Sequence, residues 1–570
     1  MADTKNGPTQ LNPQQGPSME RNLLLAFLLM GVVLFLTPYF YKSQKHAPEK
    51  PARPNPAVLE TPSASPVVAA PQAGRSLQTP APIAAGKEEL FTIETELYGI
   101  KLSNRGAVVR SWVLKKFKDS AGAPLELVSA PGAARTGYPF SLVFPDKEPA
   151  VNVNEVLYSA QPAPGGLGID YRYSDGNVTV HKIFRFERDG YLSQVSSEVM
   201  QAGAGLPHLL AWRGGFGDPS VQNAAGQQKT VFFDAASNKL NTKDAKAAKN
   251  GPVNDYGNYS FAGIEDNFFA AVFLPKASAP FDIRTVSDTV PGAADKAEQP
   301  RAGAEVGGGA GNQFTLFVGP KDLDLLRKID PRLEQMVDFG WFSLIAKPLF
   351  LIVNWLNDHL THNYGWAIVL VTILINSALL PMRLKSMKSM KHMQALAPQI
   401  AAINAKYKNV GLRDPRKQEQ NAEVMELYKK HGVNPMGGCL PMVIQLPFFI
   451  AFYKVLAVAI EMRGAHWLWV TDLSQPEHMA IRILPIAMII AQFVMQKMTP
   501  TPSADPSQQK MMMFMPLVFG FMFWSASSGL VLYWLTSNLV GIAQQWFINK
   551  SMPAPAPEPV ATSKKSGGRR

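Results

Sequence analysis

Five long apolar segments are crowded into the last 210 residues of this 570-residue chain, and no other feature constrains its fold more. They lie near residues 363–381, 440–460, 481–498, 511–527 and 529–547. Such segments are typical of transmembrane helices, which need about 20 apolar residues. A sixth apolar segment, Leu23 to Tyr41, has 19 residues and no small-residue cleavage site after it, which favours an uncleaved signal anchor over residues 21–41. We therefore predict six transmembrane helices, with both termini on one side of the membrane.

The distribution of basic residues orients these helices. Residues 382–434 hold eleven Lys and Arg against four Asp and Glu, a balance of +7 in a chain whose net charge is +12. Residues 461–480 hold one Arg against three acidic residues. By the positive-inside rule the first connection is cytoplasmic and the second lies on the opposite side. The tails, residues 1–20 and the basic residues 549–570, are then cytoplasmic. Because the basic residues cluster between apolar segments, direct nucleic-acid readout is not expected.

The region between the anchor and the helices reads as a linker followed by a β domain. Residues 42–87 are rich in Pro and Ala, which is typical of an extended spacer. Residues 88–328 alternate apolar and polar residues and contain turn signals such as Asn104-Arg105-Gly106. This pattern predicts a large antiparallel β-sandwich, which the topology places on the periplasmic side.

Residues 329–360 are predicted to form interfacial amphipathic helices. One face of residues 330–345 repeats apolar side chains at helical spacing, namely Leu333, Met336, Val337, Trp341, Leu344 and Ile345. Such a helix can lie in the membrane interface with Trp341 as an anchor. The alternative is a helix that packs on the β domain.

The cytoplasmic connection, residues 382–434, is predicted to be a helical hairpin. Its apolar seam repeats every three to four residues, through Met393, Leu396, Ile400, Ile403 and Tyr407. We expect exposed methionines near Met387 and Met390 to offer an adaptable surface to apolar client segments. The candidate contact residues of this hairpin are Met387, Met390, Lys388, Lys391 and Arg413. The alternative is a hairpin that packs only on itself, with its charge enforcing topology.

Uncharged polar side chains recur inside the apolar segments. The candidates for a polar substrate groove are Thr372, Asn376, Gln445, Gln492, Gln496 and Ser537. Polar residues at such positions are expected to face the bundle interior or a water-filled cavity. The alternative is ordinary hydrogen bonding between helices, worth about 0.6 kcal/mol on average. Because the apolar segments lack an Asp/Glu pair, a proton-coupled pump is not expected.

The sequence offers no site for a metal or cofactor. Its single cysteine, Cys439, excludes an intrachain disulfide and a cysteine-based zinc site. The glycine-rich residues 302–313 lack the Gly-Lys-Ser/Thr that a phosphate-binding loop requires. We expect no catalytic residues and no cofactor.

Several long motifs resemble one known family. They are "NPMGGCLPMVIQLPFFIAFYKVL", "DPSQQKMMMFMPLVFGFMFW", "SSGLVLYWLTSNLVGIAQQ", "GIEDNFFAAVFLP" and "DFGWFSLIAKPLF". In their order and spelling they resemble the YidC branch of the YidC/Oxa/Alb family of membrane protein insertases. The resemblance covers most of the chain and is strongest over residues 330–548. It implies a Gram-negative inner-membrane protein with a periplasmic β domain, a cytoplasmic hairpin and a five-helix insertase core, residues 361–548.

One position departs from the pattern of many family members, which carry an arginine in the hydrophilic groove of the second span. The segment "NYGWAIVLVTILINSALLP" places Asn376 there. An asparagine can hydrogen-bond a polar client segment, but it cannot attract acidic residues by charge. The polarity of the groove is retained, but this position offers no cation that could recruit acidic clients.

The resemblance implies an insertase and chaperone that inserts, folds and helps to assemble inner-membrane proteins, alone or with the Sec translocon. The implied partners are nascent membrane proteins, the Sec translocon, the ribosome and membrane lipids. A client's apolar segment would leave past bulky residues, for which the candidates are Phe448, Trp524, Tyr533 and Trp534. The alternative is a polytopic solute transporter, which predicts internal repeats. No such repeat is evident, and no residue arrangement typical of an intramembrane enzyme is present.

Overall fold

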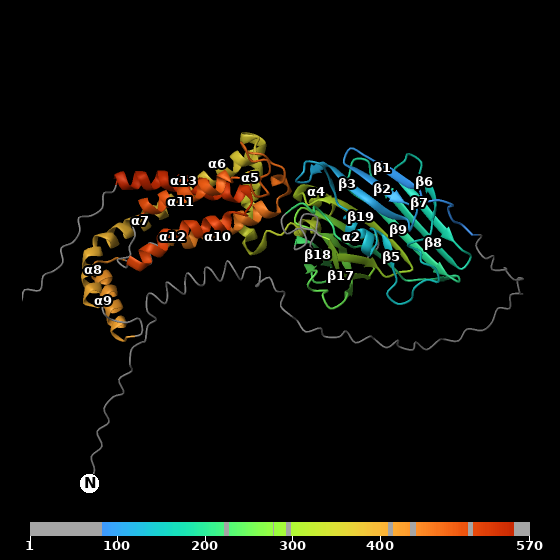
Figure 1. Ribbon diagram of the computed structural model, residues 1–570, viewed down its shortest axis with the longest axis horizontal. Helices are drawn as coiled ribbons and strands as arrows, with labels where there is room; N and C mark the ends of the chain where they lie inside the picture. Colours follow the sequence, from blue (N-terminus) through green and yellow to red (C-terminus); the bar gives the residue numbers. More distant parts are fainter. Residues whose placement is uncertain are drawn as a thin grey trace, which may run out of the picture.

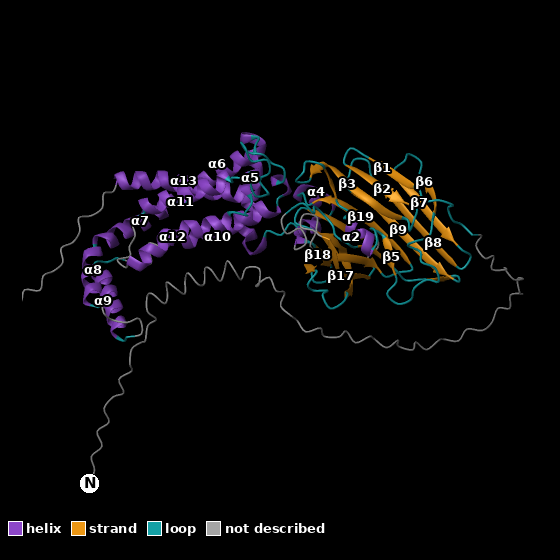
Figure 2. Cartoon of the chain, in the orientation of Figure 1, coloured by secondary structure: helices purple, strands orange, loops and turns teal. Residues whose placement is uncertain are grey.

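The computed structural model describes residues 82–221, 227–276, 279–291, 298–407, 414–433, 440–499 and 506–551. The predicted signal anchor and most of the linker lie outside these residues. The described chain forms a β domain, residues 90–320, and a helical core, residues 323–551, which lie side by side (Figure 1). Strands and helices are fully segregated between the two, apart from the short helix α2 (Ala130–Thr136) in the β domain (Figure 2).

Three antiparallel sheets build the β domain. The four-stranded sheet has the order β1 (Leu90–Glu94), β2 (Tyr98–Ser103), β3 (Val108–Lys118) and β4 (Pro124–Glu126). The five-stranded sheet has the order β14 (Val253–Gly257), β17 (Phe281–Pro291), β18 (Glu298–Gly307), β11 (Leu209–Trp212) and β5 (Ser141–Val143).

The largest sheet has ten strands. Its order is β13 (Lys239–Asp244), β12 (Lys229–Asp234), β15 (Tyr259–Glu265), β16 (Phe269–Pro275), β19 (Gly311–Pro320), β9 (Leu192–Gln201), β8 (Val178–Phe186), β7 (Gly168–Ser174) and β6 (Ser159–Pro162), with β10 (Ala204–Gly205) paired to β9. Every pairing is antiparallel, as the sequence predicts.

The aromatic core shows how the sheets face one another. Along β8, buried and half-buried residues alternate strictly, so one face of the strand points inward. Trp112 of β3 meets Phe186 of β8 at 5.9 Å and Trp212 of β11 at 6.1 Å between ring centroids. Rings from all three sheets therefore meet in one core, and the predicted antiparallel β domain is confirmed.

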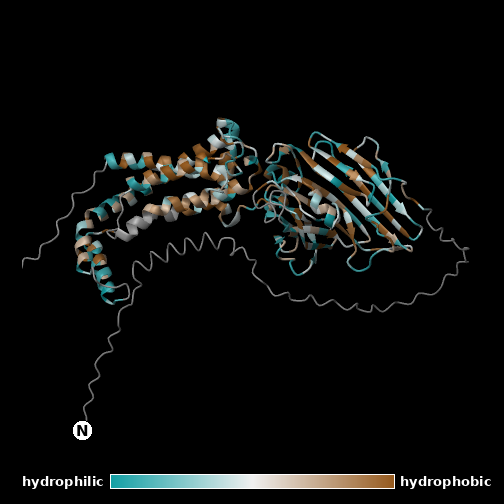
Figure 3. Cartoon of the chain, viewed as in Figure 1, coloured by the Kyte–Doolittle hydropathy of each residue, from teal (hydrophilic) through white to brown (hydrophobic). Residues whose placement is uncertain are grey.

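Helices occupy all five apolar segments of the C-terminal part. They are α6 (Tyr364–Ala378), α10 (Leu440–Val458), α11 (Ile483–Met498), α12 (Pro506–Phe523) and α13 (Ser528–Ser551). The connection after α6 forms α7 (Leu380–Ala395), α8 (Ala397–Lys406) and α9 (Arg416–Lys430). Figure 3 shows α6, α10 and α11 as mostly hydrophobic, whereas α9 is largely hydrophilic.

One pair of consecutive helices in the described chain has the length and composition of a membrane span. No single helix in the described ranges is both long and apolar enough to cross a membrane, whereas α6 and α7 together are. These two helices are bent by 56° at their junction. The shorter apolar helices include Ile483–Met498 and Met513–Phe523.

The segment between the β domain and the core differs from the sequence prediction. Instead of one amphipathic helix, the chain forms α4 (Leu323–Ile329), two 3-10 turns (Pro331–Met336 and Gly340–Phe342) and α5 (Ser343–Leu356). Gly340 has a φ of 69°, and such a residue interrupts a helix. Leu333 is fully buried, whereas Trp341 is 97% exposed. The prediction of one shared apolar face is therefore wrong, because the break turns the two halves in different directions.

The β domain and the core share a hydrophobic cluster. Phe233 and Phe261 of the ten-stranded sheet belong to it, as do Leu333 and Phe350 from the connecting segment. Arg463, in the loop between α10 and α11, also pairs with Asp218 of the β domain. The loop on the far side of the core from the hairpin is thus bound directly to the β domain.

Candidate functional site

Three of the predicted groove residues meet where α6, α10 and α13 come together. Asn376 of α6 donates through Nδ2 to Ser537 Oγ of α13 at 3.3 Å, and Gln445 of α10 donates through Nε2 to the same oxygen at 3.1 Å. Ser537 Oγ in turn lies 3.4 Å from Asn376 Oδ1, as donor. Asn376 is 5% exposed and Ser537 is 6% exposed, while Gln445 is half-buried. We call Asn376, Gln445 and Ser537 the polar cluster.

The helix packing around the polar cluster is uneven. The backbone of α13 lies close to α11 and α6, while the backbone of α10 lies close to α5 and approaches α13 over only a short stretch. The hydrogen bond between Gln445 and Ser537 bridges the seam between α10 and α13. The polar cluster therefore lies at a seam where side chains, rather than closely packed backbones, join the two helices.

Two other side chains extend the polar cluster along α13. Gln544 donates through Nε2 to the main-chain oxygen of Asn376 at 3.3 Å. Arg383 of α7 donates through Nη1 to Gln544 Oε1 at 2.7 Å. Neither residue is among the groove candidates that the sequence indicates. The available signal was the spacing, because Arg383 follows Asn376, and Gln544 follows Ser537, by seven residues, or about two helical turns.

The remaining predicted groove residues lie apart from these contacts. Thr372 is buried, but its hydroxyl donates to the carbonyl of Ile368 in its own helix at 2.6 Å. Gln492 of α11 accepts a hydrogen bond from Trp534 Nε1 at 3.3 Å. Gln496 follows one turn later on α11. The structure thus brings three of the six candidates together.

Aromatic side chains line the same seam on the side away from the hairpin. Phe452 of α10 stacks on Tyr533 of α13 at 4.6 Å, and Phe449 meets Trp534 edge-on at 4.8 Å. Phe523 of α12 lies 5.0 Å from Trp534.

The four predicted exit-face residues differ in exposure. Tyr533 is 2% exposed, so it packs inside the bundle, while Trp534 and Phe448 are half-buried. Trp524 is exposed and lies under the guanidinium of Arg482, 5.7 Å from its ring centroid.

The hairpin methionines are buried, and the prediction that they form an exposed surface is wrong. Met387 and Met390 pack with Met393, Leu396 and Ile548 in one hydrophobic cluster. The physical reason is that α7 leaves α6 at an angle and runs against the end of α13, which supplies Ile548. This contact covers the side of α7 that the sequence prediction left open.

The candidate cations of the hairpin fall into three situations. Lys391 is buried and donates to the carbonyl of Ile548 at 3.4 Å. A cation is favourable there because the C-terminal end of α13 carries the negative end of the helix dipole. Lys388 is exposed. Arg413 lies outside the described residues. Met393, Leu396 and Ile400 are buried, in agreement with the predicted seam.

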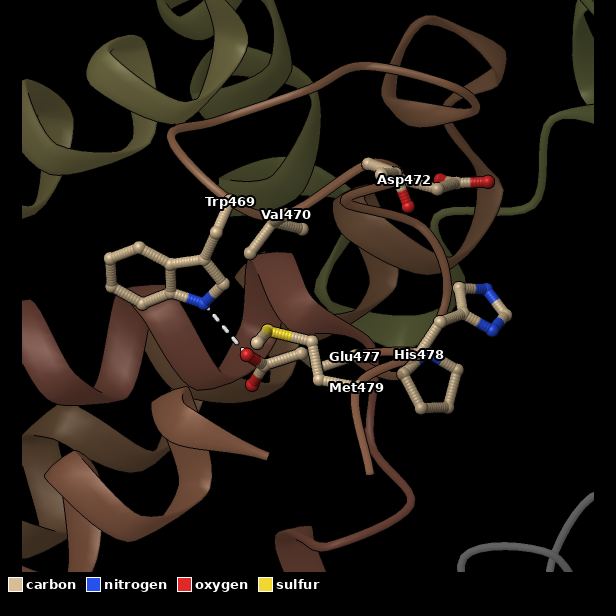
Figure 4. A pocket seen from close by; sticks show the side chains of 8 residues that line it. Trp469, Val470, Asp472, Glu477, His478 and Met479 are labelled. Carbon is tan, nitrogen blue, oxygen red and sulfur yellow. Dashed lines mark hydrogen bonds between the residues drawn. The ribbon is translucent and has the colours of Figure 1, made fainter. Parts of the chain in front are cut away.

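Two cavities of the described chain lie away from the polar cluster. One of about 160 Å³ is formed by the loop before α11, where Trp469 Nε1 donates to Glu477 Oε1 at 2.7 Å (Figure 4). Glu477 Oε2 also accepts from the main-chain nitrogen of Leu484 at 2.9 Å, so this carboxylate serves the start of α11. Within the described ranges, His, Cys, Asp and Glu form no group of three or more that could hold a metal.

Comparison with known proteins accounts for both parts of the chain. The family model described as the YidC periplasmic domain matches residues 90–352, and the model described as the 60Kd inner membrane protein matches residues 355–555. The border between the matches falls in the segment that joins the β domain to the core.

Full-length relatives show the same relationship. A membrane protein insertase YidC from Geotalea daltonii is 33% identical over 554 residues, covering 94% of this chain and 100% of the relative. One from Cupriavidus necator is 33% identical over 564 residues, covering 94% and 98%. A solved structure of an active YidC insertase covers 81% of this chain and 93% of its own, at 22% identity and a TM-score of 0.35. The chain therefore belongs to the YidC family of membrane protein insertases, a family without enzymatic activity, and is an inner membrane protein with a periplasmic domain.

Proposed function

We propose that this insertase receives the polar part of a client membrane protein at the polar cluster and releases the client's apolar segment along the seam between α10 and α13. The observation that carries the proposal is the Gln445–Ser537 bridge across the seam between α10 and α13, whose backbones approach each other over only a short stretch. Separating α10 from α13 there would expose Asn376, Gln445 and Ser537 together.

The hydrogen-bond lengths support exchange with a client. The contacts that join the helices within the cluster measure 3.1 to 3.4 Å, at the long end of the hydrogen-bond range. Bonds between helices in a membrane average about 0.6 kcal/mol, whereas an unpaired polar group in hydrocarbon costs several kcal/mol. Giving up these bonds to a client's polar group therefore lowers the barrier to its entry.

The aromatic side chains continue the path toward lipid. Trp524 is exposed and Phe448 and Trp534 are half-buried, and these three residues form the client exit face in this proposal. Tyr533, buried against Phe452, supports that face from within. Burial of the client's own apolar segment in lipid supplies the driving force, so no nucleotide or covalent step is required.

The wider topology belongs to the same proposal. Six spans with both termini in the cytoplasm place the hairpin, residues 382–434, where it meets a client first, with Lys388, Lys391 and Arg413 among its cations. Thr372, Gln492 and Gln496 serve as secondary polar positions. The Sec translocon, the ribosome and membrane lipids are the further partners that we propose.

Site-specific crosslinking tests the path. A photo-crosslinker at Asn376 or Trp534 is expected to capture a ribosome-bound nascent membrane protein. Leu539, exposed on α13 two residues beyond Ser537, provides the matched control and is expected to capture far less. Equal capture from all three positions, or none from Asn376 and Trp534, would remove the proposed path.

A further inference from the structure

The polar cluster itself carries no charge, but a cation is linked to it. Arg383 Nη1 donates to Gln544 Oε1 at 2.7 Å, and Gln544 Nε2 donates to the main-chain oxygen of Asn376 at 3.3 Å. A single glutamine side chain thus joins the guanidinium to the residue at the centre of the cluster.

A glycine on α13 makes room for this arginine. A Cβ atom built on Gly541 would lie 3.3 Å from Arg383 Nη1 and 3.2 Å from Met495 Cε. Gly541 itself is buried. The guanidinium therefore lies close against α13, three residues before the glutamine to which it donates.

The guanidinium of Arg383 keeps unused binding capacity. A guanidinium has five N–H donors, and in the described part of the chain one of them is taken, by Gln544. None of the described carboxylates lies within 4.0 Å of it, unlike Arg332 or Arg416, each of which pairs with a neighbouring aspartate. A half-buried cation without an acidic partner is costly in a helical membrane core, and such residues usually serve function.

We propose that Arg383 is a specificity-determining residue of this insertase, and that it binds acidic side chains in the polar segment of a client while the polar cluster binds uncharged groups. A guanidinium pairs with a carboxylate through two parallel hydrogen bonds, which asparagine cannot do. The charge that Asn376 lacks is then supplied from α7. This proposal rests on the proposed function, because it assumes that clients reach the polar cluster.

Paired clients test the proposal in the full-length protein reconstituted in lipid vesicles. The probes are a small single-span membrane protein with two aspartates in its translocated segment and its twin with two asparagines. Arg383→Gln is expected to lower insertion of the acidic client about tenfold relative to its twin, as expected for loss of a hydrogen bond to a charged group. Lys385→Gln removes an exposed charge two residues away and is expected to leave the insertion of the acidic client relative to its asparagine twin unchanged.

A charge reversal at Arg383 distinguishes loss of the positive charge from loss of the fold. Arg383→Glu is expected to favour a third client, with two lysines, over the acidic client, and a gain of preference does not arise from lost structure. Equal loss for all clients, or no loss in Arg383→Gln together with no reversal in Arg383→Glu, would overturn the proposal. If Asn376→Leu still impairs the asparagine client in that case, the proposed function stands; if Asn376→Leu has no effect either, the path itself fails.

Discussion

The ion pair between Arg463 and Asp218 is predicted to hold the periplasmic domain to the insertase core. The pair is almost fully buried, with 5% of the Arg463 side chain and 1% of the Asp218 side chain exposed. Arg463 Nη2 also donates to the carbonyl of Lys118 at 2.7 Å. The other carboxylate oxygen of Asp218 accepts from the main-chain nitrogen of Ser220 at 2.8 Å. Arg463→Met removes the cation while keeping much of the side-chain volume.

The cost follows from the charge that remains. Asp218 would stay buried without its cation, and breaking a buried pair in this way costs about 3–5 kcal/mol. The arginine also lies 5.6 Å and 5.4 Å from the ring centroids of Phe268 and Phe269, contacts worth about 0.5–2 kcal/mol. Asp218→Asn keeps an acceptor for Ser220 but leaves Arg463 unpaired. Because each single change removes the same interaction, the double variant is expected to cost about 2 kcal/mol less than the two singles combined.

Hydrogen exchange in detergent micelles measures these costs locally. The main-chain amides of residues 216–221 are expected to exchange faster in Arg463→Met, by the factor that matches the lost free energy. Arg482→Met is the matched control, since Arg482 follows in the same loop but contacts Trp524 of the core. If the Arg463 and Asp218 variants add within about 0.5 kcal/mol, the two residues are not coupled and the pair does not fasten the domain.

Three further predictions follow from the fold. Replacing the outer part of the hairpin, residues 397–430 with α8 and α9, by a short Gly/Ser linker is expected to abolish insertion in a protease-protection assay while the melting transition of the bundle remains. Deleting most of the β domain, residues 90–320, is expected to impair insertion more mildly in the same assay. His208 donates through Nδ1 to the carbonyl of Leu206 and accepts through Nε2 from Ser197, and burial lowers its pKa from 6.5 to about 4. Because the unfolded chain binds this proton first, the domain is expected to lose up to about 3 kcal/mol between pH 6.5 and pH 4, a loss absent in His208→Gln, as measured by denaturant unfolding.

The sequence predicted the β domain through local patterns and missed what depends on distant partners. Alternation along β8 is visible in the sequence and is confirmed by its burial. The pairing of β19 with β9 is not visible in the sequence, because it joins residues more than one hundred positions apart. The alternation of apolar and polar residues specifies which face of a strand is buried, but not which strand lies next to which.

The same limit explains the error in the hairpin. Met393, Leu396 and Ile400 are buried by the local seam that their spacing indicates. Met387 and Met390 are buried by Ile548, which lies at the other end of the C-terminal region. A period of three to four residues identifies an apolar face, but it does not reveal whether another helix covers that face.

In the candidate site, the sequence predicts which types of residue are involved, but not which of them contact one another. Asn376, Gln445 and Ser537 were chosen because polar residues in apolar segments face inward, and they do meet. Thr372 satisfied the same rule but bonds to its own helix, as threonine readily does. Arg383 was counted as a topology charge because it follows the apolar segment, and the bend after α6 brings it back against α13.

The separation of Asn376 from Arg383 has an energetic rationale. The cost of a charge in a bilayer is greatest near the middle of a span and falls toward the ends, where a long side chain reaches the interface. Asn376 lies within α6 and is neutral, whereas Arg383 lies beyond the bend, at the start of the connection that the positive-inside rule assigns to the cytoplasm. Gln544 spans the interval between them. A neutral polar centre joined to a cation nearer the surface can therefore offer both kinds of contact to a client while the deeper part of the bundle remains uncharged.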